Sequence, residues 1–80
     1  GSEMCIRDRG IADCVFVEDG KLVIVDYKTD TGVDAEALLD RYSAQLGIYR
    51  EALSQALGMP VKETLLYSFF MNSTVKVGTV

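Results

Sequence analysis

The amino-acid sequence predicts a mixed α/β domain in which one long helix follows a β-hairpin and returns the chain to the sheet. Three observations support this fold class. Two apolar, β-branched segments are separated by Asp19-Gly20, a dipeptide typical of a two-residue hairpin turn. A segment with apolar residues at helical spacing follows at residues 34–57. Two further apolar segments end the chain, so the expected order is strand, strand, helix, strand, strand.

The hairpin is predicted at residues 10–17 and 21–28, on either side of the turn. Both segments are mostly apolar on both faces, which is typical of strands that are covered on two sides. A two-residue turn fixes the pairing, and counting away from the turn places Asp13 directly opposite Asp26. The register therefore brings two carboxylates together on one face of the sheet.

The helix is predicted to begin after Asp34, whose side chain can cap its first turn, and to run to about Leu57. Gly58 and Pro60 then supply the stop signals. Its apolar stripe recurs at spacings of four and three residues and consists of Leu38, Tyr42, Leu46, Tyr49, Leu53 and Leu57.

The last two strands are predicted at residues 61–71 and 74–80, with a turn at Asn72 and Ser73. Tyr67, Phe69 and Phe70 are interpreted as sheet and core residues rather than a platform for stacking bases. A helix that returns to a parallel strand should form a right-handed crossover. One helix covers one face of such a sheet, so the other face and the open edges predict a dimer or larger homo-oligomer.

The predicted domain boundary lies between residues 9 and 10. Gly1-Ser2 resembles the scar of tag cleavage, and residues 4–9 resemble translated adapter sequence. Residues 1–9 are therefore interpreted as a tag scar or non-native leader, and residues 10–80 as one partial domain.

Composition excludes several classes of function. A formal charge of −4 with scattered Lys and Arg argues against a free-standing electrostatic nucleic-acid binder. Two cysteines, Cys5 and Cys14, are too few for a disulfide scaffold or a four-thiolate metal site, so a reduced cytoplasm is expected and Cys14 is interpreted as a core residue. No apolar run has the length of a membrane span.

Asp13, Asp26 and Lys28 form the main candidate site. Two carboxylates that face each other repel unless a cation lies between them. Mg²⁺, or Mn²⁺ as its substitute, prefers such oxygen ligands, and the carbonyl of Tyr27 would be a further one. Lys28 would orient water or stabilise charge at a phosphate. The competing interpretation is a strand-end acid beside an exposed ion pair, although acids within an apolar strand are costly unless paired or metal-bound.

Tyr42, Gln45 and Tyr49 form a second group on the predicted helix, within about 60° of one another. A glutamine within a buried stripe needs hydrogen-bond partners, so these polar atoms would lean towards the carboxylates or a DNA strand. Ordinary amphipathic packing explains the same spacing and is the favoured interpretation without further information.

Three ordered segments resemble the motifs of RecB-type nucleases in the PD-(D/E)XK superfamily, most closely the AddA-type domains of bacterial helicase–nucleases. They are GIADCVF at residues 10–16, VDYKTD at residues 25–30 and RYSAQLGIY at residues 41–49. The resemblance covers about residues 10–77 and implies a partial restriction-endonuclease-like core, the mixed sheet described above.

Carried onto this chain, the resemblance assigns the two metal-binding acids to Asp13 and Asp26 and the catalytic lysine to Lys28. Gln45 and Tyr49 correspond to the helix motif that supports the site and contacts the substrate strand. The resemblance implies a Mg²⁺-dependent DNA exonuclease of the bacterial cytoplasm that acts in double-strand break repair. Its partners would be DNA, the rest of an ATP-dependent helicase–nuclease and that enzyme's second subunit, with no membrane.

The absence of histidine is the main departure from the family pattern. Family members carry a metal-binding histidine upstream of the segment matched here, whereas this chain has none. An inactive nuclease-like module with a structural or DNA-docking role is therefore the alternative function. A Cas4-like nuclease with an iron–sulfur cluster is a second alternative, against which the lack of a cysteine cluster counts.

Overall fold

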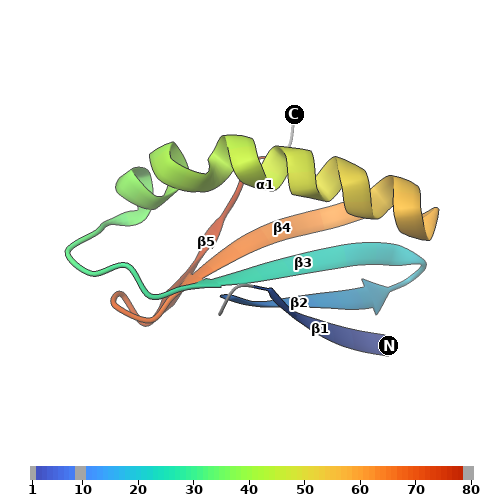
Figure 1. Ribbon diagram of the computed structural model, residues 1–80, viewed down its shortest axis with the longest axis horizontal. Helices are drawn as coiled ribbons and strands as arrows, with labels where there is room; N and C mark the ends of the chain where they lie inside the picture. The colour runs from blue at the N-terminus through green and yellow to red at the C-terminus, as the bar shows by residue number, and fades with distance from the viewer. Residues whose placement is uncertain (1, 9–10, 79–80) are drawn as a thin grey trace.

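A computed structural model describes residues 2–8 and 11–78, with side chains from residue 14 onward. One helix lies along one face of a five-stranded sheet whose strands follow the chain in the order β1-β2-β3-β4-β5 (Figure 1). The elements are β1 (Ser2–Asp8), β2 (Ile11–Glu18), β3 (Lys21–Lys28), α1 (Ala35–Leu57), β4 (Val61–Ser68) and β5 (Ser73–Lys76). The mixed α/β fold class is confirmed.

The sheet is mixed because α1 carries the chain from β3 to its parallel neighbour β4, while the other neighbouring strands pair antiparallel. The β2–β3 turn has positive φ at both Asp19 (52°) and Gly20 (73°), as in the type I′ turn that commonly closes a two-residue hairpin. The predicted register follows from this turn, and Asp13 lies opposite Asp26. The hairpin prediction is therefore confirmed.

The helix begins and ends where its capping residues predict. The Asp34 side chain accepts a hydrogen bond from the Ala37 backbone N–H at 2.8 Å. At the other end Gly58 adopts a left-handed conformation with φ of 64°, and its N–H bonds to the Ser54 carbonyl. These two caps set the length of α1 at 23 residues.

The C-terminal strands are shorter than predicted. β4 ends at Ser68 instead of running to residue 71, because the Ser68 hydroxyl accepts a hydrogen bond from the Met71 N–H at 3.1 Å and Asn72 has a φ of 50°. Phe69 and Phe70 therefore lie in the turn and are 57% and 55% exposed. Their interpretation as core residues is wrong.

The segment set aside as a leader forms β1, which pairs antiparallel with the outer edge of β2. The pairing places Cys5 opposite Cys14 in the register. Cys14 is buried, as predicted, but it is also disulfide-bonded, which its interpretation as a reduced core residue did not foresee. That residues 1–9 are non-native stays a prediction.

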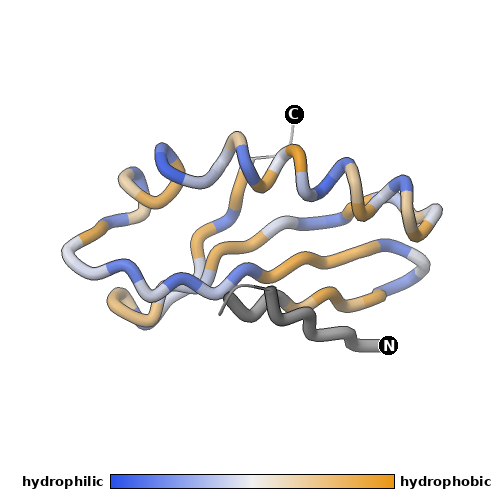
Figure 2. The backbone as a smooth tube through the Cα atoms, viewed as in Figure 1, coloured by the Kyte–Doolittle hydropathy of each residue, from blue (hydrophilic) through white to orange (hydrophobic). Residues whose placement is uncertain are grey.

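The two faces of the sheet are covered differently. Even-numbered side chains of β3, and those of β4 from Thr64 onward, point towards α1. The buried core of this layer includes Leu22, Ile24, Leu38, Leu46, Leu66 and Val75. In the described chain no element covers the opposite face, although β2, β3 and β4 are largely apolar (Figures 1 and 2). Among the described residues no helix is long and apolar enough to cross a membrane.

Candidate functional site

The candidate site lies where β3 ends, on the face of the sheet that α1 covers. Asp26 and Lys28 occupy alternate positions of β3 and are 4% and 8% exposed, which places both among the buried residues. The backbone of Asp13 lies opposite that of Asp26, while its side chain is outside the described residues. Strand pairing thus produces the predicted juxtaposition of two acidic positions and a lysine.

The Asp26 carboxylate and the Lys28 ammonium form a direct ion pair, with 3.1 Å between Oδ2 and Nζ. The competing interpretation of an exposed ion pair is wrong, because the side chains are only 6% and 9% exposed. Burying two charges costs free energy that their attraction offsets only when the geometry is good and the remaining polar atoms are satisfied. A buried pair of this kind is weak evidence for stability and calls for another explanation.

The second carboxylate oxygen of Asp26 is not satisfied. Oδ1 is buried and has no hydrogen-bond partner among the described residues. Buried polar atoms are almost always paired, so an unpaired carboxylate oxygen marks a place for a cation or water. A hard oxygen of this kind suits Mg²⁺. From residue 14 onward no three acidic, thiol or imidazole side chains gather to hold a metal, so further ligands would come from Asp13 or from backbone.

Lys28 is held on its other side by an aromatic ring. Its Nζ lies 4.1 Å from the centroid of the Tyr42 ring, within the range of a cation–π contact. The ammonium group is therefore fixed between a carboxylate and a ring face. Such a contact gains strength from desolvation, and the burial of Lys28 supplies it.

Tyr42 is itself anchored by the loop that follows β3. Its hydroxyl donates to both carboxylate oxygens of Asp30, at 2.7 and 2.9 Å. Arg41 adds a hydrogen bond from Nη1 to Asp30 Oδ2 at 2.8 Å. The hydrogen bond from Tyr42 lowers the pKa of Asp30 below its ordinary value, and the same bond raises the pKa of Tyr42. A continuous series of contacts thus links Arg41 to Asp26 through Asp30, Tyr42 and Lys28.

The Asp30 anchor was not predicted from the sequence. Asp30 lies two positions beyond Lys28 and is separated from its helix partners by 11 and 12 residues. No periodic pattern connects residues at that spacing in a loop and a helix. The available signal was the adjacency of Arg41 and Tyr42 on the helix, since two neighbouring donors can meet one carboxylate.

The helix motif is placed differently from its prediction. Gln45 is exposed, so the premise that it lies within a buried stripe is wrong. The reason is that α1 is covered on one side, where Leu38 and Leu46 are buried, and Gln45 lies towards the edge of that side. Tyr49 is half-buried and packs against the core cluster. The roles predicted for both residues stay predictions.

The side chain of Tyr27 points to the opposite face of the sheet from its neighbours Asp26 and Lys28. There its ring lies 5.9 Å from those of Tyr67 and Phe69, centroid to centroid. The predicted metal ligand is the backbone carbonyl of Tyr27, which this side-chain packing does not involve. That role stays a prediction.

Comparison with known proteins finds relatives among helicase/nuclease subunits. Curated relatives named as ATP-dependent helicase/nuclease subunits include one from Clostridium botulinum (strain 657 / Type Ba4), 42% identical over 69 residues, which are 86% of this chain and 5% of that protein. Another, from Clostridium perfringens (strain SM101 / Type A), is 38% identical over 74 residues, 90% of this chain and 6% of that protein. No solved structure matches.

The chain thus spans about a twentieth of the length of these curated relatives. The family profile described as the PD-(D/E)XK nuclease superfamily matches residues 3–79, nearly the whole chain. The resemblance noted from the sequence is therefore confirmed, and the chain belongs to the PD-(D/E)XK nuclease superfamily.

Proposed function

We propose that this chain is the catalytic core of a Mg²⁺-dependent DNA exonuclease domain that hydrolyses phosphodiester bonds. The observation that carries the proposal is the buried Asp26–Lys28 pair, in which one carboxylate oxygen has no partner among the described residues. Membership of a nuclease superfamily supports hydrolysis of a nucleic acid as the reaction. The fold offers this pair at a strand end, beside the position of Asp13.

In this proposal the metal is held by Asp13, Asp26 and the carbonyl of Tyr27. A bound Mg²⁺ supplies Lewis acidity and lowers the pKa of a water molecule that it coordinates. Because Asp26 Oδ1 has no hydrogen-bond partner among the described residues, it offers the metal a ligand without the loss of a hydrogen bond that the structure shows. Mn²⁺ is expected to substitute, because it accepts the same oxygen ligands.

Lys28 places a positive charge beside the reacting phosphate. Its ammonium is already oriented by Asp26 and the Tyr42 ring, so little reorganisation is needed when charge develops on a phosphate oxygen. Asp30 holds that ring in place through the Tyr42 hydroxyl. Gln45, exposed on α1, is available to the substrate strand, while Tyr49 supports α1 from the core side.

The larger setting is proposed from the relatives. Their name, which describes subunits of an ATP-dependent helicase/nuclease, supports a nuclease segment joined to a helicase and paired with a second subunit. We place the chain in such an enzyme in the bacterial cytoplasm, acting on DNA in double-strand break repair and recombination. The resemblance of its motifs to AddA-type domains supports that role.

A calorimetric titration with Mn²⁺ tests the metal site in the 80-residue chain. Asp26→Asn removes the charge of the candidate ligand while keeping its shape. Asp19→Asn is the matched control, because Asp19 is exposed in the turn and asparagine tolerates its positive φ. We expect binding that is lost in the first variant and kept in the second, together with Mg²⁺-dependent degradation of linear DNA that follows the same pattern.

A nuclease-like module with a structural or DNA-docking role is the second candidate function. The lack of histidine in the chain is the observation that favours it. If the unmodified chain binds DNA but neither Mn²⁺ nor Mg²⁺, the docking role is supported and the catalytic proposal for this chain fails. Equal metal binding in the unmodified chain and Asp26→Asn would also contradict the proposed site.

A further inference from the structure

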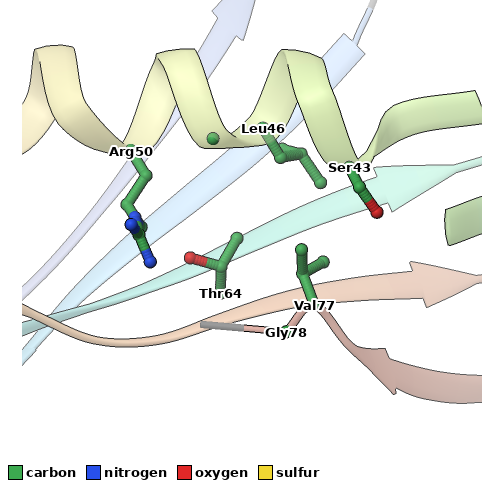
Figure 3. A pocket seen from close by; sticks show the side chains of 7 residues that line it. Ser43, Leu46, Arg50, Thr64, Val77 and Gly78 are labelled. Atoms are coloured by element: carbon green, nitrogen blue, oxygen red, sulfur yellow. The ribbon is translucent and has the colours of Figure 1, made fainter. Parts of the chain in front are cut away.

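A pocket of about 210 Å³ lies between α1 and the β4–β5 side of the sheet, apart from the Asp26–Lys28 pair. Its lining comes from one flank of α1, from Thr64 of β4 and from Val77 and Gly78, which follow β5 (Figure 3). On β4 the pocket residue Thr64 pairs with Ile24, whereas the next residue on that face, Leu66, pairs with Asp26. The pocket therefore begins one side-chain layer away from the candidate nuclease site.

Thr64 contributes an unsatisfied hydroxyl to this pocket. The residue is 2% exposed, and its Oγ1 has no hydrogen-bond partner among the described residues. A buried hydroxyl without a partner costs about 1–3 kcal/mol of folding free energy. A valine of the same shape would therefore be more favourable if packing alone decided the residue. In Figure 3 the Thr64 oxygen points to the side on which the Arg50 guanidinium lies.

Arg50 supplies the positive charge. Its side chain extends from α1 towards the sheet and is 24% exposed. The carboxylate near it belongs to Glu51, at 3.7 Å between Nη2 and Oε1, and Glu51 is itself 67% exposed. An ion pair with an exposed carboxylate at this distance contributes little, so Arg50 keeps most of its donor capacity.

Ser43 and Gly47 complete the arrangement on the helix. Ser43 lines the pocket at the end away from Arg50, and its hydroxyl points away from Thr64 (Figure 3). Between them Gly47 has no side chain, and a Cβ placed there would meet no atom within 4 Å. The absence of a side chain at Gly47 thus leaves room beside the helix, between Arg50 and Ser43.

We propose that this pocket binds a phosphate-type oxyanion through the Arg50 guanidinium and the Thr64 hydroxyl. A guanidinium donates but cannot accept, and hydroxyls are free to turn their hydrogens towards an anion. None of the lining side chains is acidic. A tetrahedral oxyanion accepts hydrogen bonds from several directions, which matches donors that belong to both the helix and the sheet.

The oxyanion has two sources, free phosphate and a phosphodiester of a nucleic-acid strand. Both present negatively charged, non-bridging phosphate oxygens to Arg50, so the same donors serve either source. The site uses neither Asp26 nor Lys28, and its occupation does not depend on hydrolysis or on a divalent metal. It is therefore testable separately from the proposed nuclease function.

The test is a titration of the ¹⁵N-labelled chain with inorganic phosphate, without divalent metal, followed by amide chemical shifts. We expect saturable shifts at Gly47 and Thr64. Arg50→Gln should weaken binding at least about tenfold, because a charge-assisted hydrogen bond is lost. The matched control is Arg41→Gln on the same helix. The Arg41 guanidinium is already bound to Asp30, so this variant should leave the Kd for phosphate unchanged.

Thr64→Val gives a second variant that keeps the packing. We expect it to weaken phosphate binding roughly fivefold and to leave the unfolding temperature unchanged or higher, since it removes an unpaired hydroxyl. No saturable shift, or an equal Kd in the unmodified chain and Arg50→Gln, would overturn the proposal.

A short single-stranded oligonucleotide distinguishes the two sources. If it displaces phosphate and shifts the same amides, the site reads a strand phosphate. If phosphate binds and the oligonucleotide does not displace it, the site is specific for the free anion. Asp26→Asn should change neither result, so loss of the nuclease proposal and loss of this one give different outcomes.

Discussion

Three consecutive residues of β3, Asp26, Tyr27 and Lys28, place charged side chains on one face of the sheet and an aromatic ring on the other. The face covered by α1 receives the charged Asp26 and Lys28. Tyr27 lies on the opposite face, which no element of the described chain covers. A fold governed by burial alone would reverse this order, with charges outside and rings inside. The covered face excludes water from Asp26 and Lys28, and the attraction between two charges is stronger where water is excluded.

Breaking the ion pair on the covered face should have the largest effect. Lys28→Met removes one partner and leaves the Asp26 carboxylate buried without its cation, at a cost of about 3–5 kcal/mol in the free energy of unfolding. Urea denaturation measures this cost. Lys21→Met, at an exposed position of the same strand, should cost less than about 0.5 kcal/mol. Similar losses in both variants would mean that the buried pair is not formed.

Truncating adjacent leucines of β4 compares the two faces directly. Leu66 points to the covered face and is fully buried, so Leu66→Ala should cost about 2–5 kcal/mol. Leu65 is half-buried on the other face, and Leu65→Ala should cost roughly 1 kcal/mol. The measurement is the shift in the denaturation midpoint at equal protein concentration. A larger loss for Leu65 would show that the second face is buried in solution.

Removing the hydroxyl that anchors Tyr42 should have a smaller effect that depends on pH. Tyr42→Phe keeps the ring over Lys28 but loses the bond to Asp30, at a cost of about 1–2 kcal/mol near neutral pH. The pKa of Asp30 is lowered in the folded state, so this stability is present above its ordinary pKa of about 3.9 and is lost as pH falls through the folded value.

The raised pKa of Tyr42 makes the stability from the same hydrogen bond decrease as pH rises, whereas the lowered pKa of Asp30 makes it decrease as pH falls. The contribution of Tyr42 is complete below the ordinary value of about 10 and is lost as pH rises through the folded value. The difference in unfolding free energy between the unmodified chain and Tyr42→Phe should therefore be constant around neutral pH. It should become smaller at both acid and alkaline pH. A difference that is flat from acid to alkaline pH would contradict the Asp30–Tyr42 bond.

Changing the exposed ring at the end of the open face should have the smallest effect on stability. Phe69 is 57% exposed and stacks on Tyr27. If this face pairs in the predicted homo-oligomer, Phe69→Ser should weaken self-association by about 1 kcal/mol, roughly fivefold in the dissociation constant. Light scattering over a range of concentrations measures it. A monomer at every concentration would refute the predicted oligomer.

Local chemistry made the hairpin and the helix predictable. Asp19-Gly20 dictates a two-residue turn, and that turn alone determines that Asp13 faces Asp26. Asp34 and Gly58 likewise terminate α1 through bonds to backbone atoms within one turn of each. In each case the deciding interaction is made by residues close in sequence.

The features that were missed depend on contacts between distant residues. Asp30 meets Arg41 and Tyr42 only after the loop and α1 have been placed against each other. β1 is stabilised by pairing along β2, which does not follow from its own composition. The exposure of Gln45 similarly reflects how much of α1 the sheet covers, a tertiary property that helical spacing does not contain.

The length of α1 determines how far apart the two sites lie along it. With 23 residues it extends about 35 Å, close to the longest dimension of the molecule, 36 Å. Its early turns hold the Tyr42 ring over Lys28, and its middle turns form the roof of the pocket at Arg50. One continuous helix therefore carries a residue of the candidate nuclease site and a residue of the pocket, and these lie eight positions apart. A rise of about 1.5 Å per residue sets their separation at about 12 Å along the helix axis.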